Sequence, residues 1–210
     1  MIEANWMLFL AASVVVIATP GQDMILVMSK SLAQGARAGV ATAAGVSVGL
    51  VGHTLLATLG LGALLRASDW VFTALKLVGA AYLVYLGLQL LLTRAASLGA
   101  ASAAPQSHSR LFATGAVSNI SNPKIAVFYF AFLPQFVAPD AVHPTATILA
   151  LGLAFAALTF LIKGPVAVFA GGLSSWFSSR PKALVWLYRC SGLVMLGLAV
   201  RLAFARRGDA

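Results

Sequence analysis

Six long apolar stretches, separated by short polar segments, constrain the fold of this chain more than any other feature. A helix that crosses a bilayer needs about 20 mostly apolar residues, and its backbone groups must find their hydrogen-bond partners within the chain. Each stretch is long enough, so the sequence predicts an all-α membrane protein with six transmembrane helices. The predicted spans run from Trp6 to Met28, Ala41 to Leu65, Trp70 to Leu92, Leu111 to Phe136, Thr145 to Leu173 and Leu184 to Phe204.

The composition agrees with a membrane location. Of the 210 residues, 60% are hydrophobic and only 9% are charged, whereas soluble domains contain about 25% charged residues. The net charge of +9 comes from cations scattered between the apolar stretches. This pattern sets membrane orientation and does not indicate nucleic-acid binding. The single cysteine, Cys190, excludes an internal disulfide and a CxxC redox pair.

A segment rich in small residues divides the chain into two halves with three predicted spans each. Residues 93–110 are polar and rich in Ala and Ser, and we predict a flexible linker there. The first half, residues 1–92, and the second half, residues 111–210, then begin on opposite faces of the membrane. If the halves are related, they form two inverted three-helix repeats within one transmembrane domain.

The basic residues of the loops predict the orientation. The second and fourth loops hold only Arg66, whereas the first, third and fifth loops hold Lys30, Arg37, Arg94, Arg110, Arg180 and Lys182. By the positive-inside rule, these three loops lie in the cytoplasm and both termini lie outside. Arg206 and Arg207 near the C-terminus favour the opposite orientation.

Two predicted spans contain a proline break at a similar depth. The stretch "ATPGQD", residues 18–23, interrupts the first span, and "SNISNPK", residues 118–124, interrupts the fourth. Paired breaks in two halves point to a transporter binding site, where freed carbonyls meet an ammonium group and a helix N-terminus meets a carboxylate. A plain proline kink is the alternative for either break. We expect the breaks to meet and to form a substrate site from Pro20, Gly21, Gln22, Asp23, Asn119, Asn122, Pro123 and Lys124.

Asp23 is the one acidic residue well inside a predicted span. A charge at the bilayer centre costs about 2.5–3.5 kcal/mol on insertion scales, so Asp23 should face the interior and have a partner. Lys124 and Lys163 are the candidate partners. We interpret Asp23 as the proton-coupling residue and Lys124 as a ligand for a substrate carboxylate. A structural ion pair, or a helix N-cap beside Pro20, is the alternative.

Two pairs of glycines, each one turn apart, mark the lead-in to the second span and the span itself: Gly35 with Gly39, and Gly45 with Gly49. Such spacing lets helix backbones approach closely, and we predict helix packing, with a sliding surface as the alternative. Together with the small mass of 21.7 kDa, the stripe suggests a homodimer. Tyr82 in the third span either packs in the core or lines the substrate site.

Three stretches carry a family resemblance: "TPGQDMILVMSKSLAQGARAGVATAAGVSVG" from Thr19, "LKLVGAAYLVYLGLQLL" from Leu75 and "NISNPKIAVFYFAFLPQFV" from Asn119. In combination they resemble the first two, third and fourth helices of the LysE/RhtB family of amino-acid exporters. Gln22 stands where that family usually has a proline. The resemblance implies export of amino acids or related small metabolites across the bacterial inner membrane, driven by the proton motive force.

The sequence therefore predicts a secondary active exporter, with a small-solute or ion channel or a membrane scaffold as the alternative. A membrane enzyme or redox carrier needs a nucleophile with a base, a thiol pair or a metal cluster. One cysteine and three separated histidines supply none of these, and the sequence has no GxxxxGK[ST] loop for a nucleotide. We expect no enzymatic activity, no cofactor and no metal site.

Overall fold

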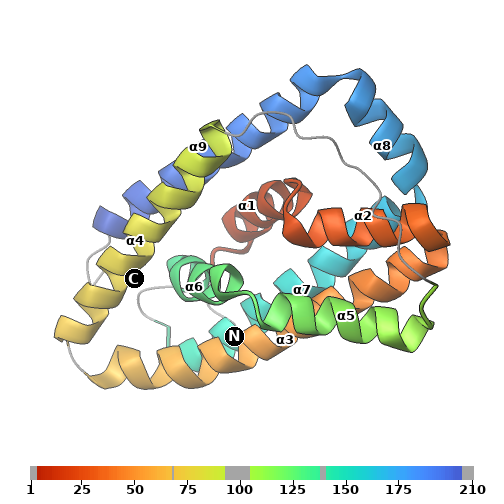
Figure 1. Cartoon of the computed structure of the whole chain (residues 1–210). Coiled ribbons are helices and arrows are strands. Elements are labelled where there is room, and N and C mark those ends of the chain that lie inside the picture. The colour runs from red at the N-terminus through yellow and green to blue at the C-terminus, as the bar shows by residue number, and fades with distance from the viewer. Residues whose placement is uncertain (1–3, 68, 93–104, 138–140, 205–210) are drawn as a thin grey trace.

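The computed structural model describes residues 4–67, 69–92, 105–137 and 141–204. Within these ranges the regular secondary structure is helical, apart from one isolated bridge between Ala4 and Val137 (Figure 1). The helices are α1 (Trp6–Ala18), α2 (Gln22–Gln34), α3 (Ala36–Ala67), α4 (Asp69–Leu92), α5 (His108–Ile120), α6 (Pro123–Phe132), the 3-10 helix η1 (Leu133–Phe136), α7 (Pro144–Val168), α8 (Ala170–Ser179) and α9 (Pro181–Phe204). The all-α class is confirmed.

Three described helices are long and apolar enough to cross a membrane: Ala36–Gly60, Pro144–Val168 and Lys182–Phe204. The pair α1 and α2, bent by 53° at its break, makes a fourth when it is counted as one span. Leu77–Leu92 and Ile125–Phe136 are shorter apolar helices at the places of the predicted third and fourth spans. A multi-pass helical protein is therefore supported, and the six-span inverted repeat stays a prediction.

The first break has a local cause. Pro20 has no N–H to donate, and α1 ends at Ala18, with Thr19 as its C-cap. The Val16 carbonyl, which Pro20 leaves without its usual donor, accepts from the Thr19 N–H at 3.3 Å. The same N–H and the Thr19 hydroxyl also donate to the Val15 carbonyl, at 3.2 and 2.7 Å. Gly21 then lies in extended backbone as the N-cap of α2. The polar groups freed by the break are thus partly satisfied within α1.

The second break separates α5, which ends at Ile120, from α6, which begins at Pro123. The N–H of Asn122 donates to the Asn119 carbonyl at 2.9 Å across this break. The fifth predicted span differs from the expectation, because α7 ends at Val168 and α8 begins at Ala170. Pro165 lies inside α7 and removes one hydrogen bond from that helix.

Two long helix pairs run antiparallel. In α3 and α7, Gly39 lies against Ala167 and Thr54 lies against Gly152. In α4 and α9, a Cβ added at Gly87 would be 3.0 Å from the Gly192 carbonyl oxygen. Figure 1 shows α4 and α9 side by side along one edge of the molecule, with α1 and α6 between them and the α3–α7 layer.

The glycine stripe of the second span packs within the chain. A Cβ at Gly45 would overlap the Phe112 carbonyl of α5, and Gly39 is equally tight against Ser31. Gly35 has a different role, because it is the C-cap of α2 with φ 87° and has open space around its Cα. Since the stripe is used inside one chain, it no longer argues for the homodimer, which stays a prediction.

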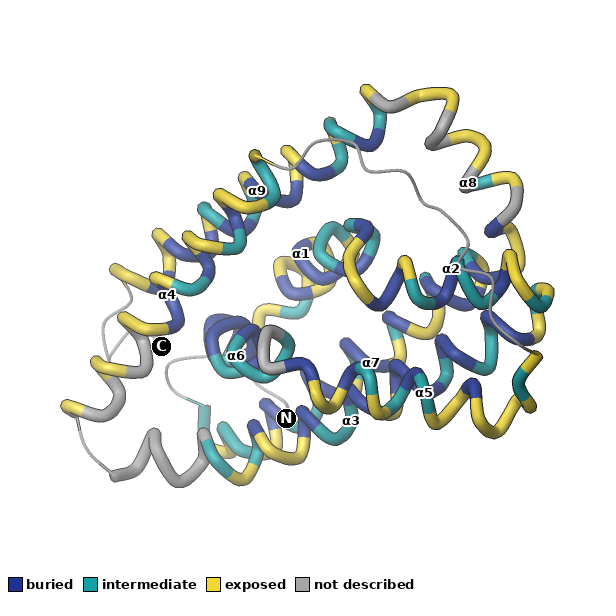
Figure 2. Tube along the Cα trace, in the orientation of Figure 1, coloured by how far each residue is buried: buried dark blue, intermediate teal, exposed yellow. Residues whose placement is uncertain are grey.

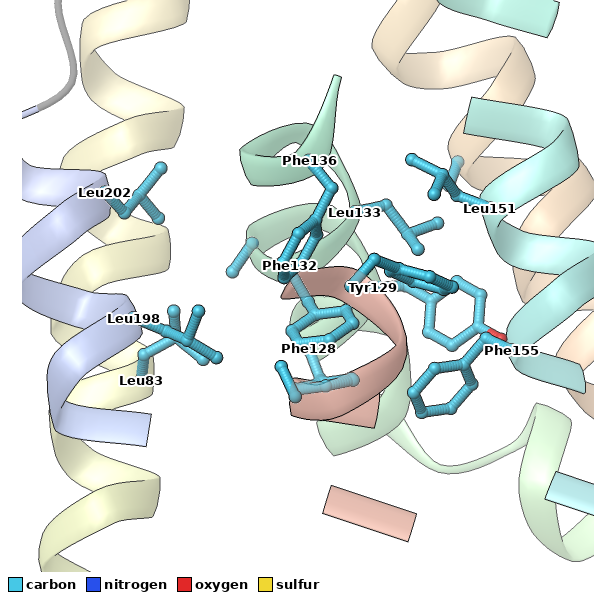
Figure 3. Packing of buried hydrophobic residues seen from close by; sticks show 14 of the residues in the cluster. Leu83, Phe128, Tyr129, Phe132, Leu133, Phe136, Leu151, Phe155, Leu198 and Leu202 are labelled. Atoms are coloured by element: carbon cyan, nitrogen blue, oxygen red, sulfur yellow. The ribbon is translucent and has the colours of Figure 1, made fainter. Parts of the chain in front are cut away.

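The apolar core centres on α6 and η1 (Figures 2 and 3). Phe128 stacks on Phe132 at 4.7 Å between ring centroids, and Phe132 contacts Phe136 at 4.8 Å. In Figure 3, Leu198 of α9 faces these rings from one side and Phe155 of α7 lies on the other. In a bilayer, such packing stabilises by van der Waals contact, because lipid tails are as apolar as the rings. The core fixes α6 between the two antiparallel pairs.

Candidate functional site

The two helix breaks lie beside each other and are joined by hydrogen bonds. The Asn122 side-chain amide donates to Gln22 Oε1 at 3.3 Å. The Asn119 amide donates to Asp23 Oδ2 at 2.8 Å in a buried bond. Residues about 100 positions apart in the chain therefore form one polar junction, as two facing breaks would.

Asp23 is buried at this junction and forms an ion pair. Lys163 of α7 places its Nζ 3.4 Å from Asp23 Oδ2, and each side chain is only 9% exposed. The other carboxylate oxygen, Oδ1, is also buried and has no hydrogen-bond partner among the described residues. Because an unpartnered buried oxygen is costly, Oδ1 is available for a further donor.

The start of α2 adds to the electrostatics of Asp23. Gly21 is the N-cap and offers no side-chain cap, so Asp23 lies in the first turn and is not itself the N-cap. The first backbone bond of this helix joins the Ile25 N–H to the Gly21 carbonyl. The preceding N–H groups have no partner within the helix, and this positive end stabilises negative charge nearby.

A cavity of about 270 Å³ opens beside the junction. Its volume is just below the range of about 300–1,000 Å³ for drug-sized ligands, so it suits a small metabolite. The polar part of the lining is Thr19, Gln22, Asp23, Gln89, Asn122, Tyr129, Thr159, Lys163 and Ser191. The apolar part includes Leu50, Leu86, Leu90, Phe128, Phe155 and Met195. A carboxylate and an ammonium group beside an apolar wall can bind a zwitterion with an apolar side chain.

The sequence matches the LysE type translocator family over residues 14–206. The chain belongs to this family. It is 33% identical to the homoserine/homoserine lactone efflux protein of Salmonella typhimurium, over 96% of the chain and 97% of that protein. It is 28% identical to the leucine efflux protein of Klebsiella pneumoniae, over 95% and 94% respectively. No solved structure matches. The family consists of membrane transporters, so this translocator is a multi-pass bacterial membrane protein and not an enzyme.

The translocator's cavity brings together most of the residues predicted from the breaks. Pro20, Gly21, Gln22, Asp23 and Asn122 line it, and Asn119 contacts Asp23 from the α5 side. Lys163, the second of the two candidate partners, forms the ion pair. The side chains of Pro123 and Lys124 lie outside the described residues.

Tyr82 is not part of the described lining. Its ring lies 6.2 Å from that of Tyr85 on α4, beside the apolar core. The described residues contain no group of three or more metal-ligating side chains.

Three threonine and serine hydroxyl groups of the cavity were not predicted from the sequence, and neither was the lining residue Tyr129. Thr159 is 1% exposed, and its Oγ1 has no hydrogen-bond partner within the described residues. It lies one helical turn before Lys163 and therefore on the same face of α7. Thr19 and Ser191 hydrogen bond to each other across α1 and α9. Proximity to Lys163 is the one sequence signal that could have singled out Thr159.

Proposed function

We propose that this translocator exports small zwitterionic amino acids by secondary transport coupled to protons. The observation that carries the proposal is the buried Asp23–Lys163 pair at the junction of two broken helices, with Asp23 Oδ1 unpartnered beside a small cavity. The printed functions of the relatives, efflux of homoserine or its lactone and of leucine, support an amino-acid substrate. Both of these amino acids carry no net charge.

Substrate recognition divides between the two charges of the site. The substrate ammonium group approaches Asp23, which accepts it at Oδ1. The carboxylate binds Lys163 Nζ and the Thr159 hydroxyl, with the free N–H groups at the start of α2 as further donors. The side chain then lies against the apolar wall of Phe128 and Phe155. Lys124, predicted as a carboxylate ligand, stays a candidate second donor.

Coupling follows from competition for one carboxylate. When Asp23 is charged, Lys163 and Asn119 hold it across the junction. A proton that enters from outside neutralises Asp23, weakens this attraction and favours a second arrangement of the helices. The substrate ammonium competes with the proton for Asp23, so proton entry and substrate exit alternate. A ligand shifts such an equilibrium only through a difference in its binding to the two states.

An inverted repeat gives this alternation a structural basis. The antiparallel packing of α3 with α7 and of α4 with α9 supports two halves related by an axis in the membrane plane. The contacts at the ends are in keeping with the proposed orientation. The Asn5 N–H donates to the Phe136 carbonyl at one end, and Lys30 bonds to Gln106 at the other. We assign the first of these ends to the outer face.

The test uses purified protein in vesicles with an imposed pH gradient and labelled leucine and homoserine as probes. Asp23→Asn keeps the size of the side chain and removes its titration, so it should still exchange substrate across the vesicle membrane. It should fail to concentrate substrate against the gradient. Accumulation equal to that of the parent protein would refute the coupling role.

A matched pair of lysine variants tests the substrate contact. Lys163→Met removes the ammonium group at the cavity, whereas Lys30→Met removes a lysine that bonds to Gln106 outside the cavity. Only Lys163→Met should weaken substrate binding in a thermal-shift titration, since a bound ligand raises the melting temperature. If the parent protein and the variants conduct an ion current and none of them accumulates substrate, the protein is a channel and not an exporter.

A further inference from the structure

We propose that His53 and Gly49 of α3 are positioning residues that hold Asn119 against Asp23. The proposal rests on the function proposed above, because it says which residues orient the Asn119 amide toward the proposed coupling carboxylate of Asp23. Neither residue lines the cavity as described. We place their action on Asp23 through Asn119; His53 also has its ring 5.9 Å from that of Tyr129, which does line the cavity.

Asn119 links α3 to Asp23 through its two ends. Its side-chain amide donates to Asp23 Oδ2 at 2.8 Å, and its backbone carbonyl lies 3.0 Å from His53 Nε2. The residue is fully buried and lies in the last turn of α5. Carbonyls in the last turn of a helix have no partner within it; the Asn119 carbonyl accepts from the Asn122 N–H at the break, and His53 adds a second contact from the neighbouring helix.

Gly49 and His53 lie one turn apart on the same face of α3, and each contributes differently. A Cβ at Gly49 would lie 2.8 Å from Asn119 Cβ, 2.9 Å from Asn119 Oδ1 and 2.9 Å from the Ala116 carbonyl oxygen, closer than a Cβ normally approaches. Gly49 therefore gives the Asn119 side chain its space. His53, only 2% exposed, fixes the backbone from which that side chain extends. The two contacts leave Asn119 little freedom other than to face Asp23.

His53 does not relay protons along this route. A backbone carbonyl accepts a hydrogen bond and releases no proton, so His53 Nε2 must carry the hydrogen. The Asn119 amide between His53 and Asp23 does not titrate either. The imidazole therefore acts only as a hydrogen-bond donor at a fixed position, and another side chain that donates from the same position should replace it.

The first test is rescue by a conservative variant. Gln places an amide N–H near the position of the His Nε2–H, so His53→Gln should keep most proton-driven accumulation of leucine in vesicles. His53→Met fills similar space without a donor, and we expect about a three- to ten-fold loss, the range of one buried hydrogen bond. Accumulation by His53→Met at the parent level, or an equal loss in both folded variants, would overturn the donor role.

A double-mutant cycle separates this proposal from the proposed coupling role of Asp23. If His53 acts through Asn119, His53→Met should cause no further loss in an Asn119→Ala background. The cycle is read from substrate exchange as well as from accumulation, so it stays informative if Asp23 proves uncoupled. Additive losses would mean that His53 acts by another route and would overturn the proposal.

A matched pair of glycine variants tests whether Gly49 leaves the space that Asn119 needs, and neither variant removes a hydrogen-bond donor. Gly49→Ala should displace Asn119 and lower transport, whereas Gly52→Ala on the same helix meets only the flexible end of Ile120, at 2.7 Å from Cδ1. Thermal unfolding in detergent checks that both variants fold. Equal transport by the two folded variants would show that the space at Gly49 does not position Asn119.

Discussion

The ion pair between Asp23 and Lys163 makes a quantitative prediction for stability. Lys163→Met leaves a carboxylate that is 9% exposed with the Asn119 amide as its remaining described partner. Removing one partner of a buried pair costs about 3–5 kcal/mol, whereas replacing both partners by neutral groups is often close to neutral. We therefore expect Lys163→Met to lower the free energy of unfolding by about 3 kcal/mol or more. The double variant Asp23→Asn/Lys163→Met should recover most of the loss.

In Lys163→Met, protonation of Asp23 should reduce the loss of stability, and this makes the loss depend on pH. A buried carboxylate that has lost its cation escapes the cost by taking up a proton. Stability of Lys163→Met should therefore fall further below the parent as the pH rises, and this pH dependence should be absent when Asp23 is also Asn. Lys30→Met is the control, because the partly exposed Lys30 bonds to a neutral amide at 3.2 Å. It should cost no more than about 1 kcal/mol.

The free energies of unfolding are measured on the purified variants in mixed micelles, with increasing fractions of a denaturing detergent. The two single variants and the double variant form a double-mutant cycle, which gives the interaction energy between positions 23 and 163. Strictly additive single losses would refute the ion pair as a stabilising contact. A Lys163→Met variant as stable as Lys30→Met at every pH would show that Asp23 is neutral in the folded protein.

Three further predictions follow from contacts at the cavity and the helix crossings. Gly45→Ala should lower the stability of the folded protein by about 1–3 kcal/mol, because the added methyl group overpacks against α5. Gly164→Ala is the control, because a Cβ there has open space and should not lower stability. Thermal unfolding of the two variants compares their stabilities. A disulfide between Thr19→Cys and Ser191→Cys should block transport in vesicles, and a reductant should restore it, since the bond would tie α1 of the first half to α9 of the second. Thr159→Val should raise the leucine concentration for half-maximal uptake about three- to ten-fold, with Thr159→Ser close to the parent.

The breaks could be predicted from the sequence because their cause is local. Pro20 removes a helix hydrogen bond whatever surrounds it, and it disfavours helical backbone at the residue before it, Thr19, which is extended. The same local reasoning finds the interruption before Pro123. A charged residue inside a predicted span, such as Asp23, is costly in hydrocarbon, so the sequence also predicts that it has a partner.

The identity of that partner could not be predicted, because it depends on packing between distant helices. Lys163 lies 140 residues from Asp23 in the chain, and only the placement of α7 against α2 brings them together. Spacing alone also failed to separate Gly35 from Gly39, Gly45 and Gly49. The four share a repeat, but Gly35 ends a helix and the others face a neighbouring helix.

The contacts to Asp23 come from the other half of the chain, which supports the coupling role proposed for this residue. Asp23 belongs to the first half of the chain, and its described partners, Asn119 and Lys163, both belong to the second. The neighbouring bond from Asn122 to Gln22 crosses the same boundary. A change of charge on Asp23 therefore alters the attraction between the halves and leaves contacts within each half intact. If the halves move against each other, protonation and substrate binding at this one carboxylate act directly on that motion, and no relay to a distant hinge is needed.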